Sequence, residues 1–230
     1  MAAFELFSFW TVLAFGFVLG IRHAFEADHI AAVTTIVLND KGGLKKHSTI
    51  GVMWGLGHSI ALMLVGLAVL LFGLSITPAV SGVFELIVGI VLVGLGFVTM
   101  RNFLDKSFHM HVHMHGKAKH THMHSHRETS DHMHQHKPLM MGMLHGLAGG
   151  GALMLIVLVA VNSLVEGILY IILFGIGSIL GMLAVTSILS ATLNSTAARA
   201  RNFGEKVKVI AGIVSIFLGF MIITGVFLAG

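Results

Sequence analysis

The chain has 230 residues, of which 56% are hydrophobic and only 10% are charged. In a soluble domain of this length about a quarter of the residues are charged, so the composition excludes an ordinary water-soluble protein. The chain contains no cysteine, which also excludes disulfides and thiolate metal sites.

Long apolar runs follow one another along the chain, and each can cross a hydrocarbon core about 30 Å thick. We therefore expect an all-α, polytopic protein with six transmembrane helices in the lipid bilayer. The predicted spans are residues 5–38, 48–74, 80–101, 139–162, 166–193 and 206–229. The first is long for a single crossing, and we expect it to be tilted or broken near Gly20. It is also too long and too polar at its end for a cleaved signal peptide.

Basic residues fall in alternate loops between the predicted spans. Apart from Arg22, they are Lys41, Lys45 and Lys46 in the first loop, Arg101, Lys106, Lys117, Lys119, Arg127 and Lys137 at the third, and Arg199, Arg201, Lys206 and Lys208 at the fifth. Because basic residues mark the cytoplasmic side, these loops are predicted to face the cytoplasm and both termini the outside of the cell membrane. The formal charge of +4 then reflects topology, and nucleic acid is not an expected partner.

The first span contains five polar groups within the segment "GIRHAFEADHIAAV": Arg22, His23, Glu26, Asp28 and His29. Ionisable groups at membrane depth are costly and usually face a polar interior or one another. Imidazole and carboxylate ligands suit divalent Ni²⁺, Co²⁺ and Zn²⁺. On a regular helix His23 and Asp28 lie about 140° apart, and His29 lies about 100° further round. If the three share one ion, the helix must unwind there, as in transporters; otherwise one of them orients another ligand.

Two further histidines belong to the predicted site. His58 in "GLGHS" and His145 in "GMLHG" lie early in the second and fourth spans, and His58 reaches a depth similar to that of His23. A single histidine in an apolar helix is more often a hydrogen-bonded interior residue, but the four together with Asp28 favour a metal site. Since a cation would repel the metal, Arg22 is interpreted as a structural partner of Glu26, four positions later, or of a backbone carbonyl.

The two halves of the chain resemble each other in three segments that occur in the same order. Residues 20–32 match 142–154 at Gly-x-x-His, residues 54–64 match 174–184 at Gly-x-Gly, and 89–97 match 212–220 at six of nine positions. Three spans per half require opposite directions of crossing, which predicts an inverted-topology repeat. The predicted organisation is a first repeat over 1–104, a histidine-rich cytoplasmic loop over 105–138 and a second repeat over 139–230.

At these residues the chain resembles a known family. "RHAFEADHIAAV" is similar to the His-x-x-x-x-Asp-His signature of nickel/cobalt transporters, and "LGHS", which includes Ser59, is similar to their second motif. "GMLHGLAGGGALMLIVL" resembles instead the urease-accessory membrane proteins of the same superfamily. The resemblance implies that His23, Asp28, His29 and His58 select and carry Ni²⁺ or Co²⁺ as the transported ion, with no resident cofactor. It does not imply a direction, because the typical importers are longer.

The third loop carries a histidine tract over residues 109–136. Its eleven histidines are His109, His111, His113, His115, His120, His122, His124, His126, His132, His134 and His136. Such a low-complexity segment cannot build a core, and we expect it to be disordered without metal. It could buffer entering ions, gather ions for efflux, or sense the cytoplasmic load.

The sequence thus predicts a secondary transporter of Ni²⁺ or Co²⁺, with uptake favoured by the first signature. Efflux, or transport of another divalent metal such as Zn²⁺, is the alternative. An intramembrane metalloenzyme would carry a His-Glu-x-x-His helix, which this chain lacks, so an enzyme is not expected. A second copy of the chain or a cytoplasmic metallochaperone are the protein partners that fit this interpretation.

Overall fold

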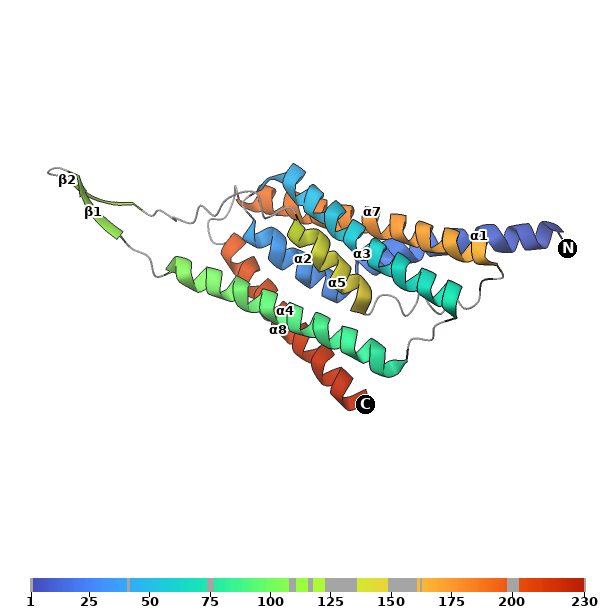
Figure 1. The fold of residues 1–230 in the computed structure, drawn as a ribbon. Helices are drawn as coiled ribbons and strands as arrows, with labels where there is room; N and C mark the ends of the chain where they lie inside the picture. Colours follow the sequence, from blue (N-terminus) through green and yellow to red (C-terminus); the bar gives the residue numbers. More distant parts are fainter. Residues whose placement is uncertain are drawn as a thin grey trace.

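The computed structural model describes residues 2–40, 42–73, 77–107, 111–115, 118–122, 136–148, 161, 163–197 and 203–229. Within this part of the chain the helices are α1 (Ala2–Ala24), α2 (Ala27–Asn39), α3 (Leu44–Phe72), α4 (Pro78–Ser107), α5 (His136–Ala148), α7 (Leu164–Ala197) and α8 (Phe203–Ala229). The strands are β1 (His111–His115) and β2 (Ala118–His122). Figure 1 shows an elongated helical bundle with both termini toward one end and the β1–β2 hairpin at the other.

Four helices confirm four of the predicted spans. Their membrane-crossing parts are Leu44–Phe72, Ala79–Leu104, Leu164–Leu193 and Glu205–Leu228. They agree with the predicted spans to within a few residues, because long apolar runs leave little choice but a helix when no water can bond the backbone. The chain is therefore a multi-pass membrane protein.

The first predicted span is broken, but not at Gly20. Helices α1 and α2 are together long and apolar enough to form one span, and they are bent by 52° at their junction. The break falls at Phe25 and Glu26, whose amides bond to the carbonyls of Arg22 and His23, three residues back, while Glu26 has an extended backbone. Gly20 instead lies within α1, where an added Cβ would overlap the carbonyl of Phe174 in α7. The prediction that the first span is broken is therefore confirmed, but the break lies a few residues beyond Gly20, because this glycine serves helix packing.

The fourth predicted span, 139–162, is described only at its beginning. Helix α5 has 13 residues, too few to cross a bilayer by themselves. Residues 149–160 and 162 of that span lie outside the described part of the chain. Together with the broken pair, the described helices provide up to five spans.

The helices pack in pairs through small residues. Helix α1 lies along α7, α3 lies against both α5 and α7, and α4 lies along α8. A Cβ added at Gly142 in α5 would overlap the carbonyl of Trp54 in α3. Between α4 and α8, a Cβ at Gly219 would lie 2.6 Å from the carbonyl oxygen of Gly89. Such glycines let helix backbones approach closely, which is how helices associate in lipid.

The histidine tract contains regular structure where its composition predicted none. Strands β1 and β2 pair antiparallel, with His111 opposite His122 and His113 opposite His120. The segments alternate histidine with other residues, including β-branched Val112 and Thr121, and such alternation with a period of two fits a strand pair. The regular structure of the membrane-crossing part that the structure describes is all α-helix, as expected, with a break at Phe25 and Glu26.

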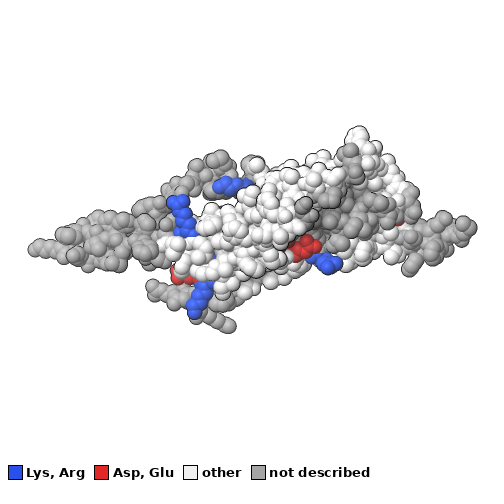
Figure 2. All heavy atoms as spheres, turned by 90° about the horizontal axis from the view of Figure 1, so that it is seen from below, with Lys and Arg blue, Asp and Glu red and all other residues white. Residues whose placement is uncertain are grey.

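Charged side chains are concentrated at one end of the bundle. Figure 2 shows most of the visible Lys and Arg side chains toward the end where α4 finishes and α5 begins. Exposed basic residues there include Lys45, Lys46, Arg101 and Lys137. The loops that carry them therefore share one end, as their alternation along the chain predicted.

Candidate metal site

Four histidines from four different helices meet inside the bundle, and we call them the histidine cluster. They are His23 at the end of α1, His29 in the first turns of α2, His58 in α3 and His145 in α5. None is more than 3% exposed. The ring centroids of His23 and His29 are 4.6 Å apart, those of His29 and His58 5.1 Å, and those of His29 and His145 5.2 Å. The structure thus brings together the histidines that the sequence singled out.

The ring nitrogens of three of these residues are spaced like metal ligands. The Nε2 atoms of His23 and His58 are 3.0 Å apart, and one ligand atom each from His23, His29 and His58 lies within 4.8 Å of the other two. With bonds of about 2.1 Å to an ion, nitrogens at a right angle are about 3.0 Å apart and opposite ones about 4.2 Å. Small side-chain rotations would therefore suffice for these three imidazoles to hold one ion.

Each of the two histidines at the helix break, His23 and His29, has a carboxylate oxygen close to its Nδ1 atom. Glu26 Oε2 lies 3.1 Å from His23 Nδ1, and Asp28 Oδ1 lies 3.1 Å from His29 Nδ1. A carboxylate that accepts the Nδ1 proton fixes the tautomer in which Nε2 carries the free lone pair, and metal-binding histidines are commonly held in this way. Asp28 is thus placed to orient the His29 ring, which corresponds to one of the two roles left open by the sequence.

Several nitrogens of the histidine cluster are buried without a hydrogen-bond partner in the described part of the chain. They are His29 Nε2, His58 Nδ1 and both ring nitrogens of His145. Leaving a buried polar atom unpaired costs about 1–3 kcal/mol. A bound cation would satisfy such lone pairs, so the donor set fits a metal ion of the imidazole-preferring kind.

The family of the chain is shown by its sequence relatives. Residues 30–221 match the family of the cytochrome C biogenesis protein transmembrane region. The chain belongs to this family.

Two curated proteins are similar to this family member, and no solved structure matches it. The urease accessory protein UreH of Bacillus sp. (strain TB-90) is 34% identical over 207 residues, which cover 90% of this chain and 88% of UreH. The cobalt transport protein NhlF of Rhodococcus rhodochrous is 32% identical over 104 residues, 40% of this chain and 29% of NhlF. These relatives support a nickel/cobalt-transporter-like membrane protein, and the similarity to UreH extends well beyond the second half.

Of the three supporting residues, Glu26 makes a contact other than the predicted pair with Arg22. The Arg22 side chain is exposed, and Glu26 pairs with His23 instead of with Arg22. The predicted pairing assumed a continuous helix, and the break after Ala24 removes the required spacing. Ser59 donates a hydrogen bond of 3.1 Å to the carbonyl of Gly175, which fixes α3 against α7 beside His58.

Two aromatic residues that sequence reasoning missed enclose the histidine cluster. The ring centroid of Trp54 lies 5.1 Å from that of His145, and Phe174 lies 5.6 Å from His23. Both aromatic residues are at most 1% exposed. Their signal is present in the sequence, since they occupy matching positions at the start of "WGLGHS" and "FGIGSI".

The two strands of the histidine tract that the structure describes lie away from the histidine cluster. His111, His113, His115, His120 and His122 belong to the β1–β2 hairpin, which projects away from the bundle (Figure 1). His136 begins α5. The remaining tract histidines, His109, His124, His126, His132 and His134, lie outside the described residues.

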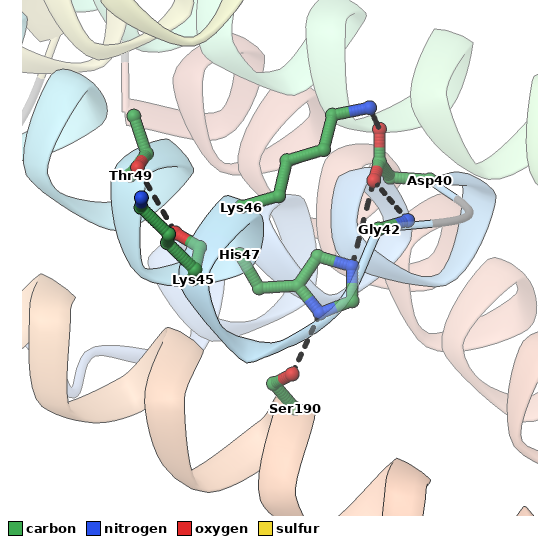
Figure 3. A network of polar contacts seen from close by, with 7 residues as sticks. All are labelled: Asp40, Gly42, Lys45, Lys46, His47, Thr49 and Ser190. Carbon is green, nitrogen blue, oxygen red and sulfur yellow. Dashed lines mark hydrogen bonds and ion pairs between the residues drawn. The ribbon is translucent and has the colours of Figure 1, made fainter.

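A polar network at the basic end ties the turn between α2 and α3 to α7 (Figure 3). Asp40 accepts a hydrogen bond from the Gly42 amide at 2.6 Å and pairs with Lys46 at 2.8 Å. Asp40 also lies 3.6 Å from His47 Nε2, and His47 Nδ1 is 2.8 Å from Ser190 Oγ. This network, which the sequence did not indicate, fixes where α2 ends.

A hollow of about 1230 Å³ opens beside that network. It is lined from α2, α3, α4 and the start of α5, and its polar lining includes Thr35, Asn39, Lys45, Lys46 and Lys137. Asn39 donates a hydrogen bond of 2.8 Å to Thr99 Oγ1 in α4. Helix α2 thus carries His29 at its beginning and lines the hollow at its end.

Proposed function

We propose that this protein is a secondary transporter that carries Ni²⁺ or Co²⁺ across the cytoplasmic membrane through the histidine cluster. The observation that carries the proposal is the convergence of four buried imidazoles from four helices, with three ligand atoms within 4.8 Å of one another. Buried ring nitrogens without a hydrogen-bond partner destabilise a protein core, whereas a dehydrated cation can bind to them. The names of the relatives, one a cobalt transport protein and one a urease accessory protein, support this substrate class.

The break between α1 and α2 places two of the proposed ligands next to each other, and movement at this break would allow the ion to be released. His23 and His29 approach each other because α1 ends and α2 begins between them. The carbonyl end of α1 carries partial negative charge, which favours a cation beside it. Binding sites at such discontinuous helices are typical of transporters, and rocking of the surrounding helices opens them to each side in turn.

We further propose that the architecture is a six-span, inverted 3+3 repeat. Its support is that equivalent residues of the two halves make equivalent contacts. Gly20 meets the carbonyl of Phe174, and Gly142 meets that of Trp54. In the third spans, Gly89 meets the carbonyl of Gly219, and Gly96 meets that of Gly212. The sequence match pairs Gly20 with Gly142 and Trp54 with Phe174, so one contact is the repeat counterpart of the other.

For the direction, we propose uptake, with the histidine tract and the hollow on the cytoplasmic side. The basic loops share the end that contains the hollow, and basic residues favour the cytoplasm. An inside-negative potential contributes about 2.3 kcal/mol per charge per 100 mV, which favours entry of a dication. Lysines around the hollow would disfavour rebinding of an ion released there.

The test is flux of radioactive Ni²⁺ into proteoliposomes that contain the full-length protein, with Co²⁺ and Zn²⁺ as competitors. Saturable uptake above that of protein-free liposomes, inhibited by Co²⁺ more strongly than by Zn²⁺, is the expected result. Flux that matches protein-free liposomes would refute the transport function, and stronger inhibition by Zn²⁺ would reassign the substrate.

Orientation is tested separately in cells. Because the chain has no cysteine, a single cysteine at Thr77 or at Ser125 can be labelled without background. We expect a membrane-impermeant thiol reagent to label Thr77→Cys in intact cells and Ser125→Cys only after permeabilisation. The reverse pattern would invert the topology and favour efflux.

A further inference from the structure

A second group of candidate ligands lies beside the histidine cluster, and we call it the capture group. It consists of Glu26, Asp28 and His29, whose ligand atoms lie within 4.8 Å of one another. The side chains of Glu26 and Asp28 are 41% and 28% exposed, whereas His29 is 1% exposed. Carboxylates at the middle of a membrane span do not face lipid but water or other polar groups.

His29 belongs to the capture group and also to the three residues of the histidine cluster, His23, His29 and His58, whose ligand atoms lie close together. Its Nδ1 lies 3.1 Å from Asp28, and its buried Nε2 has no hydrogen-bond partner in the described structure. The His29 side chain therefore lies between the half-buried carboxylates and the buried imidazoles. An ion bound to the capture group need only exchange its other ligands to reach the histidine cluster.

We propose that the capture group is a distinct first binding site, which takes a partly hydrated Ni²⁺ or Co²⁺ from water and passes it to the histidine cluster through His29. This inference rests on the proposed function, because it assigns the entry step of the same pathway. The shared ligand makes the two positions alternatives for one ion. No bond other than metal–ligand and hydrogen bonds changes in the transfer.

The chemistry of the two positions suits this order. Carboxylate oxygens and exposure let an ion keep several of its waters, so capture requires little dehydration. Imidazole nitrogens bind Ni²⁺ and Co²⁺ more selectively than carboxylates do. Because the histidine cluster is buried, an ion bound there would lose most of its water ligands. Glu26 and Asp28 contact Nδ1 of His23 and His29 in the structure, and these contacts are compatible with an ion bound to the Nε2 atoms.

Arg22 and the helix ends set the charge around the capture group. Two carboxylates give it a formal charge of −2, and the exposed Arg22 guanidinium on the last turn of α1 reduces that value. The positive end of α2 is offset by Asp28 in its first turn. The remaining negative charge attracts a dication without holding it as tightly as a fully dehydrated site would.

The competing role for Glu26 is orientation of His23 alone, and the test separates the two. Co²⁺ binding to the purified full-length chain is titrated after the eleven tract histidines have been replaced by glutamine in every sample. His23→Ala removes the residue that Glu26 would orient but leaves the capture group complete. We expect His23→Ala to retain weak Co²⁺ binding and the added Glu26→Gln to weaken it at least about tenfold.

Glu205→Gln, in the first turn of α8, is the matched control and should change the Co²⁺ affinity less than about twofold. Equal affinity of His23→Ala with and without Glu26→Gln would overturn the capture group, and so would absence of Co²⁺ binding by folded His23→Ala. If His23→Ala does not fold, His23→Phe is the background for the same comparison, because it keeps a ring of similar size but has no nitrogen for Glu26 to orient. Failure of the parent protein in the flux assay would refute transport but leave this binding comparison intact.

Discussion

Replacement of His58 by alanine tests the histidine cluster most directly. His58 provides one of the three ligand atoms that lie within 4.8 Å of one another, and its Nε2 is 3.0 Å from that of His23. Loss of a residue that merely orients a ligand costs about 10–100-fold in metal affinity. We therefore expect the loss of a direct ligand to weaken Ni²⁺ binding at least about 100-fold, which corresponds to about 2.7 kcal/mol.

The variant should remain folded, which makes the test informative. A cavity at a fully buried position costs about 2–3 kcal/mol. The substitution also removes His58 Nδ1, which is buried without a partner in the described structure, and an unpaired polar atom of this kind costs about 1–3 kcal/mol. The substitution also removes the 3.0 Å contact between the Nε2 atoms of His23 and His58, so we expect a modest net loss of thermal stability in detergent.

The assay is calorimetric Ni²⁺ titration of full-length protein with the tract histidines replaced, together with flux into proteoliposomes. His47→Ala is the matched control, because His47 is a buried histidine of the same helix that contacts Ser190 and Asp40 away from the histidine cluster. It should retain Ni²⁺ affinity within about threefold. Unchanged affinity in folded His58→Ala, or an equal loss in His47→Ala, would refute the reasoning.

Three further predictions concern packing, the polar network and the tract. Gly177→Ala should lower the free energy of unfolding by about 1–3 kcal/mol in thermal unfolding, because its Cβ would overlap the Phe17 carbonyl. The control is Gly94→Ala, where an added Cβ meets nothing within 4 Å, and this variant should be neutral or stabilising. Equal effects of the two substitutions would contradict close packing at Gly177. Ser190→Ala should cost about 1 kcal/mol through its 2.8 Å contact with His47, and this loss should disappear in a His47→Ala background. Replacing the tract histidines by glutamine should preserve flux but change its dependence on Ni²⁺ concentration, and complete loss of flux would show that the tract belongs to the pathway.

The spans and the ligand types could be read from the sequence because both depend on local chemistry. An apolar run must become a helix in lipid wherever it is long enough, which placed the four confirmed spans. Histidines inside such runs are too costly to be incidental, which singled out His23, His29, His58 and His145. Helical geometry also required the helix to unwind somewhere in this segment if His23, Asp28 and His29 were to share one ion.

The position of that break and the partners of each group could not be read in the same way. Gly20 looked like a breaking point but faces the backbone of α7, and Glu26 matched the spacing for Arg22 but pairs with His23. The sequence by itself determined which side chains are available at membrane depth. Only the tertiary structure decided which of their atoms face each other, because that depends on how closely α1, α3, α5 and α7 approach and on the 52° bend that no local pattern encodes.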